Sequence, residues 1–402
     1  MLKLVVINKR VGPIRGRHPW VFSGALKNIP DGIKSGTPVE LFDEVGNFLA
    51  SGYFNSYSQI AVRLWGYEDA EAVDEDFFVR RIKSAYELRK KLVERKGTDS
   101  FRVINSENDL LPGLIVDKYS DCLSVQFHNA GINVWKKEIV AALVKVLSPK
   151  GIYERSDVGN RTKEESGNEK EFIGILFGKI PEEIKILENG LKFVVDVASG
   201  QKTGFFLDQR DKRQALMKYC KDKTVLNCFS YTGGFSVYAL SAGAKKVVSV
   251  DTSESALKLA EKNIQLNKLD SKRSELVLAD VKDYLGGLLD NDPELKGEKF
   301  DVIILDPPAF VKSRHKVYEG LQGYRKINEL AIRLLPPGGI LVSASCSQHV
   351  SMMDFRHMLS EAAARAGKTV QILETYTHGI DHSELVAFTE GEYLKCIFAI
   401  VR

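Results

Sequence analysis

The sequence predicts an α/β protein: a C-terminal Rossmann-like domain with a mainly parallel, doubly wound sheet, preceded by a small β-rich domain and an α+β middle domain. From about residue 186 onward, short apolar strand-like segments alternate with helical segments, a pattern typical of βαβ units. The first 65 or so residues contain only short β-type segments between Gly, Pro, Asn and Asp turn residues. The 402 residues suffice for about two or three domains. We place the domains at residues 1–70, 71–185 and 186–402.

The N-terminal domain combines these short strands with a basic segment. Residues 9–18 contain Lys9, Arg10, Arg15 and Arg17 and no acidic residue. Phosphates of a nucleic acid would be attracted to such a segment. On charge alone, a solvated basic terminus explains it equally well.

The middle domain begins with a predicted helix over residues 74–96. Six apolar residues recur at a spacing of three to four and predict the buried face, with the basic residues on the other faces: Phe77, Phe78, Ile82, Ala85, Leu88 and Leu92. Residues 80–96 carry eight basic residues against Glu87 and Glu94, which again suits RNA or a solvated helix face. Strands over 101–104, 114–119, 123–127 and 151–157 and a helix over 134–147 complete this α+β domain.

Composition narrows the class of protein. Hydrophobic residues make up 44% and charged residues 27%, as in soluble globular proteins, and no apolar run reaches the length of a membrane helix. Five scattered cysteines without a Cys-x-x-Cys pair, and a short apolar N-terminus, predict a cytoplasmic protein without disulfides. The histidines show no metal-ligand spacing, so we expect no metal. The net charge of +4 is too small to indicate nucleic acid by itself.

The first strand of the C-terminal domain runs into a glycine-rich turn at Gly233 and Gly234 before a helix. Asp251 and Asp280 end the second and third strands, where they could bind ribose hydroxyls and an adenine amino group. The turn lacks the G-x-G-x-x-G pattern of dinucleotide oxidoreductases. The ordered set suits S-adenosylmethionine, whereas either aspartate alone could equally be a helix N-cap.

Several segments along the chain resemble class I S-adenosylmethionine-dependent methyltransferases, and more narrowly the 23S rRNA cytosine-5 methyltransferase family that begins with a PUA domain. They are Leu111–Asp117 (LPGLIVD), Tyr153–Asp157 (YERSD), Lys202–Arg210 (KTGFFLDQR), Tyr231–Ser236 (YTGGFS) and Asp306–Phe310 (DPPAF). The resemblance covers essentially the whole chain. One departure is Asn227, where the family more often has Asp; its amide could still bond to the cofactor.

This resemblance implies a cofactor site for S-adenosylmethionine. The segment with Phe205 and Phe206 is expected to fold over the cofactor, with Gln209 or Arg210 adding polar contacts. The full set of expected cofactor-binding residues is Gln209, Asn227, Phe229, Gly233, Asp251, Asp280, Asp306 and Pro307.

The strand ends at Asp306 and Cys346 predict the chemical site. Two prolines stiffen the loop after Asp306, so a flipped base could stack on Phe310 and bond to Asp306. A thiolate at Cys346 that adds to carbon 6 of cytosine would make carbon 5 nucleophilic. Related two-cysteine enzymes have a second cysteine where this chain has Ala309, so one cysteine would serve addition and release. Lys312, Arg314 and His315 are further candidates for phosphate contact.

The resemblance thus implies formation of 5-methylcytosine in large-subunit rRNA. Arg15 and Arg17 of the PUA-like domain are the expected phosphate contacts, and Trp20 is either an RNA-stacking or a core residue. Two alternatives stay open: a methyltransferase for a base nitrogen, such as that of guanine, and a non-catalytic RNA-binding or ribosome-assembly protein. A homodimer is expected from the family, and no membrane association.

Overall fold

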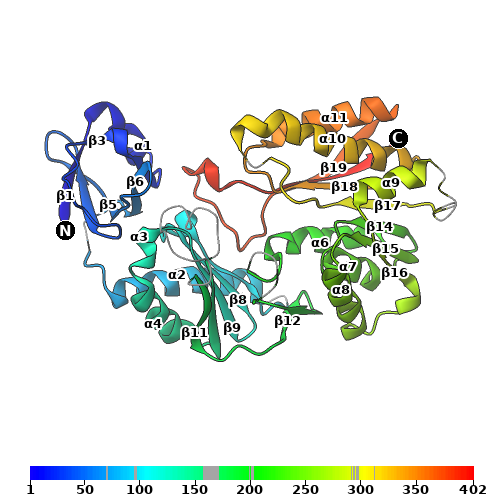
Figure 1. Cartoon of the computed structure of the whole chain (residues 1–402), viewed down its shortest axis with the longest axis horizontal. Coiled ribbons are helices and arrows are strands. Elements are labelled where there is room, and N and C mark those ends of the chain that lie inside the picture. The colour runs from blue at the N-terminus through cyan, green and yellow to red at the C-terminus, as the bar shows by residue number, and fades with distance from the viewer. Residues whose placement is uncertain are drawn as a thin grey trace. The chain divides into compact units, whose positions relative to one another are not determined.

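The computed structural model divides into two compact units, each with its own core (Figure 1). It describes residues 1–68, 71–94, 97–156, 172–198, 200, 203–290, 292, 295, 298–311 and 313–402. Unit 1 comprises Met1–Glu188, Val195–Leu207 and Ile380–Gly391. Unit 2 comprises Asn189–Val194, Asp208–Gly379 and Glu392–Arg402.

The N-terminal part of unit 1 is a six-stranded sheet in the order β2-β6-β5-β4-β1-β3. Its strands are β1 (Leu2–Val6), β2 (Trp20–Phe22), β3 (Leu26–Lys27), β4 (Pro38–Phe42), β5 (Phe48–Phe54) and β6 (Ile60–Gly66), and α1 (Val11–Arg15) follows β1. Strands β1 and β4 are parallel, whereas the other pairs are antiparallel. Apolar residues from these strands form a separate small core, which agrees with the predicted β-rich domain.

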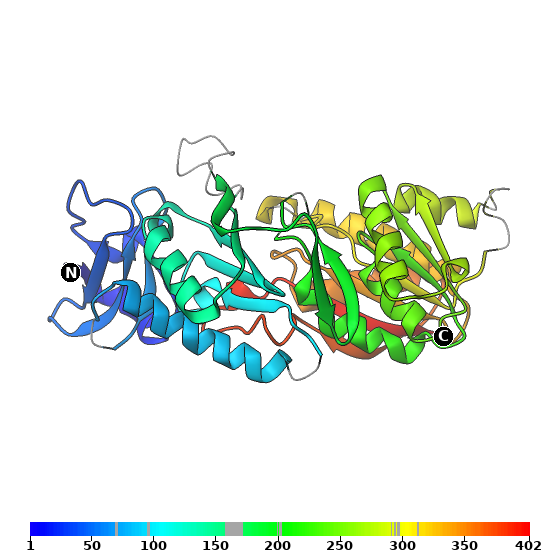
Figure 2. The ribbon, with the colours of Figure 1, turned by 90° about the horizontal axis from the view of Figure 1, so that it is seen from below.

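The second part of unit 1 is a five-stranded sheet in the order β11-β10-β9-β8-β7. Its elements are α2 (Glu75–Val93), β7 (Phe101–Asn105), β8 (Leu114–Tyr119), β9 (Cys122–Phe127), α3 (Ala130–Asn133), α4 (Lys136–Leu147), β10 (Gly151–Arg155) and β11 (Ile173–Gly178). Helices α2 and α4 pack against each other on one side of the sheet (Figures 1 and 2). Phe77, Ile82 and Leu143 belong to the same buried cluster as residues of β7, β8 and β9.

Helix α2 begins as the sequence predicts, but its buried face differs in the last turns. Asp74 caps the helix by accepting a hydrogen bond from the Phe77 amide. Leu88, expected in the core, is 46% exposed, whereas Arg89 is buried. The Arg89 guanidinium donates to both Asp109 oxygens, at 2.6 and 2.7 Å. A buried cation is tolerated when a carboxylate pairs with it in this bidentate way, so the expectation that the basic residues avoid the buried face is wrong for Arg89.

Unit 2 contains a seven-stranded sheet in the order β16-β15-β14-β17-β18-β20-β19, which confirms the predicted Rossmann-like α/β fold. Its strands are β14 (Thr224–Cys228), β15 (Lys246–Asp251), β16 (Ser274–Leu278), β17 (Val302–Leu305), β18 (Ile340–Ser345), β19 (Val370–Tyr376) and β20 (Lys395–Val401). The first five are parallel, and β20 lies antiparallel between β18 and β19. A two-stranded pair of β12 (Ile184–Glu188) and β13 (Leu191–Val195) precedes this sheet in sequence.

Helices cover both faces of this sheet (Figure 1). Helices α6 (Arg210–Leu216), α7 (Gly234–Ser241) and α8 (Glu254–Leu266) lie on one face, and α9 (Val281–Leu289), α10 (Val317–Leu334) and α11 (Met352–Ala366) on the other. Strand order reverses between β14 and β17, so the carboxyl ends of these two strands open the crevice where ligands of such sheets bind. No helix among the described residues has both the length and the apolar composition needed to cross a membrane.

Candidate active site

The loop after β14 has a strained backbone. Phe229, Tyr231 and Gly233 have φ angles of 58°, 46° and 73°, in the left-handed region that favours glycine. A Cβ at Gly233 would lie 2.8 Å from the Ala260 Cβ, so only glycine fits there. Gly233 also leaves the first amides of α7 without a side-chain cap. A loop held in such conformations at a sheet's carboxyl edge is typical of a binding site.

The two aspartates of the predicted cofactor site have different partners. Asp251 accepts hydrogen bonds from the Tyr231 amide at 2.8 Å and the Ser253 amide at 2.9 Å, and thereby ties the β14 loop to the end of β15. Oδ1 of Asp280 accepts from the Lys282 and Asp283 amides and caps α9. Asp280 therefore acts as a helix N-cap, and its exposed carboxylate has a second oxygen for a ligand.

Three buried polar atoms near these strand ends have no hydrogen-bond partner among the described residues: Asn227 Oδ1, Gln209 Oε1 and Ser230 Oγ. The Asn227 amide nitrogen donates to Ser236 Oγ at 2.8 Å. Buried polar atoms normally have partners, so unpaired ones point to a missing ligand or water. An amino acid sulfonium linked to adenosine has both donors and acceptors and suits this set, so the residues present fit S-adenosylmethionine.

The Asp306 carboxylate, half-buried after β17, accepts a hydrogen bond from Gln209 Nε2 at 2.8 Å. The buried Lys212 ammonium donates to the Asp208 and Thr377 carbonyls. Burial lowers the pKa of Lys212, and the nearby carboxylates, Asp306 among them, oppose this shift. Asp306 is thus oriented by an amide and lies in the field of a buried cation.

Cys346 directly follows β18, the parallel neighbour of β17. Its Sγ lies 3.9 Å from the Pro307 carbonyl oxygen. All five cysteines are described, and Cys346 is the one that is not buried. Burial raises the pKa of Cys220 and Cys396 to about 12. The structure therefore brings the two predicted catalytic residues to adjacent strand ends, with the most accessible thiol of the chain among them.

The hydroxyl of Ser347 joins the Asp306 loop to the Cys346 segment. It accepts from the Val311 amide at 3.1 Å and lies 2.9 Å from the Tyr324 hydroxyl. The rings of Phe310 and Tyr324 are 4.6 Å apart, and a Cβ at Gly323 would lie 3.1 Å from the Phe310 ring. Phe310 is therefore half-buried and packs on α10.

Sequence reasoning missed Lys395 and Lys212 altogether. Lys395 begins β20 and is 1% exposed, and its ammonium donates to the Ser347 carbonyl at 2.7 Å. The one available signal was a lysine at the start of an otherwise apolar strand. Phe205, expected over the cofactor, is buried in unit 1, where its amide donates to the Tyr119 hydroxyl at 3.1 Å. Lys202 and Lys312 lie outside the described residues.

The RNA contacts predicted for the N-terminal domain lie in unit 1. The exposed Arg15 pairs with Asp43 at 3.2 Å, and the Arg17 guanidinium lies 4.8 Å from the centre of the Tyr67 ring. Trp20 donates to Glu107 at 2.8 Å and packs against Phe388, so it contributes to packing within the unit.

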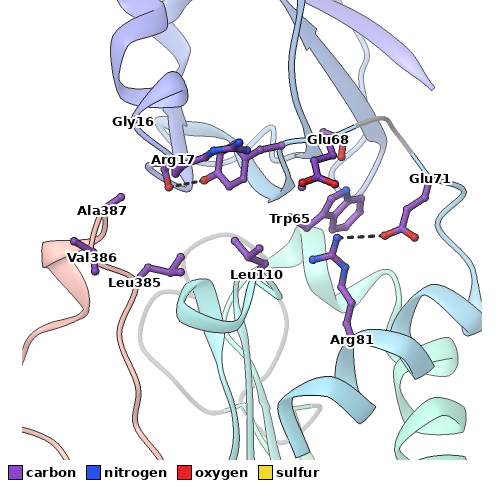
Figure 3. Close-up of a pocket in the computed structure, with 13 residues that line it drawn as sticks. Gly16, Arg17, Trp65, Glu68, Glu71, Arg81, Leu110, Leu385, Val386 and Ala387 are labelled. Atoms are coloured by element: carbon purple, nitrogen blue, oxygen red, sulfur yellow. Dashed lines mark hydrogen bonds and ion pairs between the residues drawn. The ribbon is translucent and has the colours of Figure 1, made fainter. Parts of the chain in front are cut away.

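Arg17 also borders a pocket of about 930 Å³ (Figure 3). Arg81 and Glu71, paired at 3.2 Å, line the pocket, and Leu110 and Leu385 are among its apolar residues. The pocket therefore combines charged and apolar side chains beside an exposed arginine.

No group of three or more His, Cys, Asp or Glu side chains in the described part of the chain could hold a metal ion.

Two family models match the chain: a PUA-like domain at residues 4–66 and an S-adenosylmethionine-dependent methyltransferase at residues 167–385. The chain is 43% identical to the ribosomal RNA large subunit methyltransferase I of Aeromonas salmonicida, over 98% of this chain and 97% of that protein. It is 44% identical to the protein of the same name from Aliivibrio fischeri, over 95% of each chain.

Two solved structures resemble the whole chain at 25% identity, and each alignment covers 100% of both chains. A proposed SAM-dependent methyltransferase from Streptococcus mutans superposes with a TM-score of 0.83. A proposed methyltransferase complexed with SAH superposes with a TM-score of 0.85. The similarity therefore extends over both units of the chain.

Proposed function

Since the chain belongs to the S-adenosylmethionine-dependent methyltransferases and, among them, to the ribosomal RNA large subunit methyltransferase I family, we propose that it forms 5-methylcytosine through a covalent adduct on Cys346. Membership in this family makes the protein an rRNA methyltransferase. The choice of cytosine and the covalent route are the proposal. The observation that supports it is the 3.9 Å separation between Cys346 Sγ and the Pro307 carbonyl, which puts a half-buried thiol at the Asp306 loop.

The cofactor supplies a methyl group on a positively charged sulfur, which a carbon nucleophile can attack. The β14 loop, Asp251 and Asp280 hold the adenosine part in this proposal, and Asn227, Phe229, Gln209 and Pro307 complete the site. Asn227 Oδ1 and Gln209 Oε1 are the unpaired buried acceptors that such a ligand would satisfy.

In the proposed reaction, the Cys346 thiolate adds to carbon 6 of the flipped cytosine. The S–C6 bond forms, and the electrons of the C5–C6 double bond make carbon 5 nucleophilic. Carbon 5 takes the methyl group, a general base removes the C5 proton, and the re-formed double bond expels the thiolate. Asp306, held by Gln209, bonds to the polar edge of the base, and Phe310 stacks on it.

In this proposal, residues 1–70 bind rRNA, and Arg15 and Arg17 contact its phosphates. A middle domain spans residues 71–185, and the methyltransferase domain spans residues 186–402. The family resemblance also predicts a homodimer in the cytoplasm. Light scattering on the purified protein tests the dimer.

A trapping assay tests the reaction. The protein, S-adenosylmethionine and a 23S rRNA fragment with 5-fluorocytidine are resolved on a denaturing gel, because fluorine blocks the final proton removal. Wild type should give a covalent RNA–protein band, and so should the control Cys122→Ala, which alters a buried cysteine of β9. Cys346→Ala should give none.

If Cys346→Ala still methylates unmodified RNA at the wild-type rate, the covalent route is wrong and methylation of a base nitrogen takes its place. The acceptor pair of the Asp306 carboxylate and the Pro307 carbonyl would suit an amino group in that case. If folded protein neither binds S-adenosylmethionine nor transfers methyl groups, the non-catalytic alternative is favoured.

A further inference from the structure

Lys395 is placed beside Cys346 by the pairing of two strands. In the antiparallel register of β18 and β20, Lys395 lies opposite Ser345, the residue before Cys346. The Lys395 ammonium donates to the Ser347 carbonyl at 2.7 Å and to the Tyr393 carbonyl at 2.9 Å. Lys395 therefore adjoins Cys346 in two ways: its backbone pairs with the residue before the cysteine, and its ammonium binds the carbonyl of the residue after it.

The surroundings of this ammonium are unusual for a cation. Lys395 is 1% exposed and makes no ion pair within 4.0 Å with a carboxylate of the described residues. Burial lowers the pKa of Lys395 to about 8. The charges that oppose this shift come from each neighbouring element: Glu392 before β20, Cys346 after β18 and Asp354 in α11. Burial disfavours the charged form of this group, and the hydrogen bonds described above bind it only to backbone carbonyls. The presence of a cation here therefore requires an explanation.

The interaction between Lys395 and Cys346 acts in both directions. A Cys346 thiolate favours the charged form of Lys395, and the Lys395 ammonium therefore favours the thiolate by the same free energy. Tyr324 also interacts with Cys346, through the network around Ser347. Burial raises the pKa of Tyr324, so this neighbour on α10 stays uncharged at neutral pH.

We infer that Lys395 is a positioning residue that keeps a fixed positive charge beside Cys346, so that the thiol ionises near neutral pH while its sulfur stays at the Asp306 loop. The inference rests on the proposed role of Cys346 as the nucleophile. The Cys346 proton leaves to solvent, the sulfur keeps the electron pair that attacks the base, and Lys395 keeps its own proton. Because its side chain is buried, Lys395 does not touch the RNA base and is not the general base of the reaction.

The pH dependence of thiol alkylation tests this without RNA or cofactor. Wild-type protein is treated with iodoacetamide at pH 5.5 to 9.5, and modification of the peptide that contains Cys346 is followed by mass spectrometry. We expect the rate to reach half its maximum at least one pH unit below an ordinary thiol, whose pKa is about 8.5. A wild-type midpoint at or above the ordinary value overturns the inference, whatever any variant does.

Two substitutions separate charge from structure. Lys395→Met removes the charge and should raise the midpoint and slow alkylation at pH 7 about tenfold, the effect of one pKa unit. Lys395→Arg keeps the charge and should restore the low midpoint. If Lys395→Met folds, as judged by its circular dichroism, and keeps the wild-type midpoint, the charge does not act on Cys346.

Lys368→Met is the matched control. Lys368 also donates to backbone carbonyls, those of Ile332 and Arg333 at the end of α10 and that of Leu335, and burial also lowers its pKa. Its loss should leave the Cys346 midpoint unchanged. The trapping assay gives an independent result. If the wild-type protein forms no RNA adduct but keeps the low midpoint of Cys346 alkylation, the covalent reaction is contradicted, whereas the ionisation of the thiol near neutral pH still stands.

Discussion

Gln209 donates its side-chain amide to Asp306 at 2.8 Å, and this bond joins the segment before α6 to the loop after β17. The carboxylate is therefore oriented before substrate binds, by a residue that is 3% exposed. An acidic group that must bond to one edge of a base gains from such preorganisation, because a free rotamer would have to be ordered during the reaction.

Replacement of Gln209 tests this orientation. Gln209→Leu keeps the size of the side chain but removes the donor to Asp306, and we expect kcat/KM for rRNA methylation to fall about tenfold, the effect of losing one charge-assisted hydrogen bond. Steady-state methyl transfer to an rRNA fragment is the measurement. The control is Gln214→Leu on α6, an exposed residue bonded to Met217, which should keep the wild-type value. Equal kinetics for both variants would contradict the role of Gln209.

The backbone of the β14 loop predicts an effect on stability and on cofactor affinity. Gly233→Ala places a Cβ 2.8 Å from that of Ala260 at a φ of 73°, and we expect a loss of about 1–3 kcal/mol in the free energy of unfolding. SAH should also bind more weakly in calorimetry. Gly286→Ala in α9 is the control, because its Cβ meets nothing within 4 Å. It should stabilise the protein by about 0.5–1 kcal/mol. Unchanged SAH affinity in Gly233→Ala would separate this loop from cofactor binding.

The exposed Arg17 predicts an electrostatic contribution to RNA binding. Arg17→Gln should weaken the binding of an rRNA fragment and reduce the slope of log K against log salt by about one, since one phosphate contact is lost. Filter binding between 50 and 250 mM salt measures both. The control is Lys34→Gln, an exposed cation of the same domain, which should leave the slope unchanged. Identical slopes for all three proteins would exclude Arg17 from the interface.

The buried ion pair between Arg89 and Asp109 predicts a large effect on stability. Arg89→Met leaves Asp109, whose side chain is 8% exposed, without its cation, and we expect a loss of about 3–5 kcal/mol in the free energy of unfolding. Arg80→Met on the same helix removes a 56% exposed side chain paired with Glu71 and should leave the stability nearly unchanged, because water screens an exposed ion pair. Urea denaturation of both variants compares the two pairs directly. Equal losses would mean that the Arg89 pair behaves as a surface pair.

Much of the fold follows from local patterns. Alternating apolar segments predict β14 to β18 and the helices between them. Parallel strands present their carboxyl ends at one edge of the sheet. The sequence therefore predicts that Asp306 and Cys346 lie near each other, although it gives no distance between them. The last turns of α2 could not be predicted in this way, because the partners of the buried Arg89, Asp109 and groups of Asp381 and Ser383, come from other elements.

By itself the sequence determined the order of the elements, the sheet edge that carries the candidate chemistry and the residue types found there, since these depend on periodicity and on turn residues. The tertiary structure alone decided which groups surround those residues. Lys395 and Ser347 are 48 residues apart and meet because β20 inserts between β18 and β19. Asp251 binds the Tyr231 amide because the β14 loop adopts left-handed backbone angles. Burial, charge and hydrogen bonding at the site arise from such long-range contacts, which no local pattern encodes.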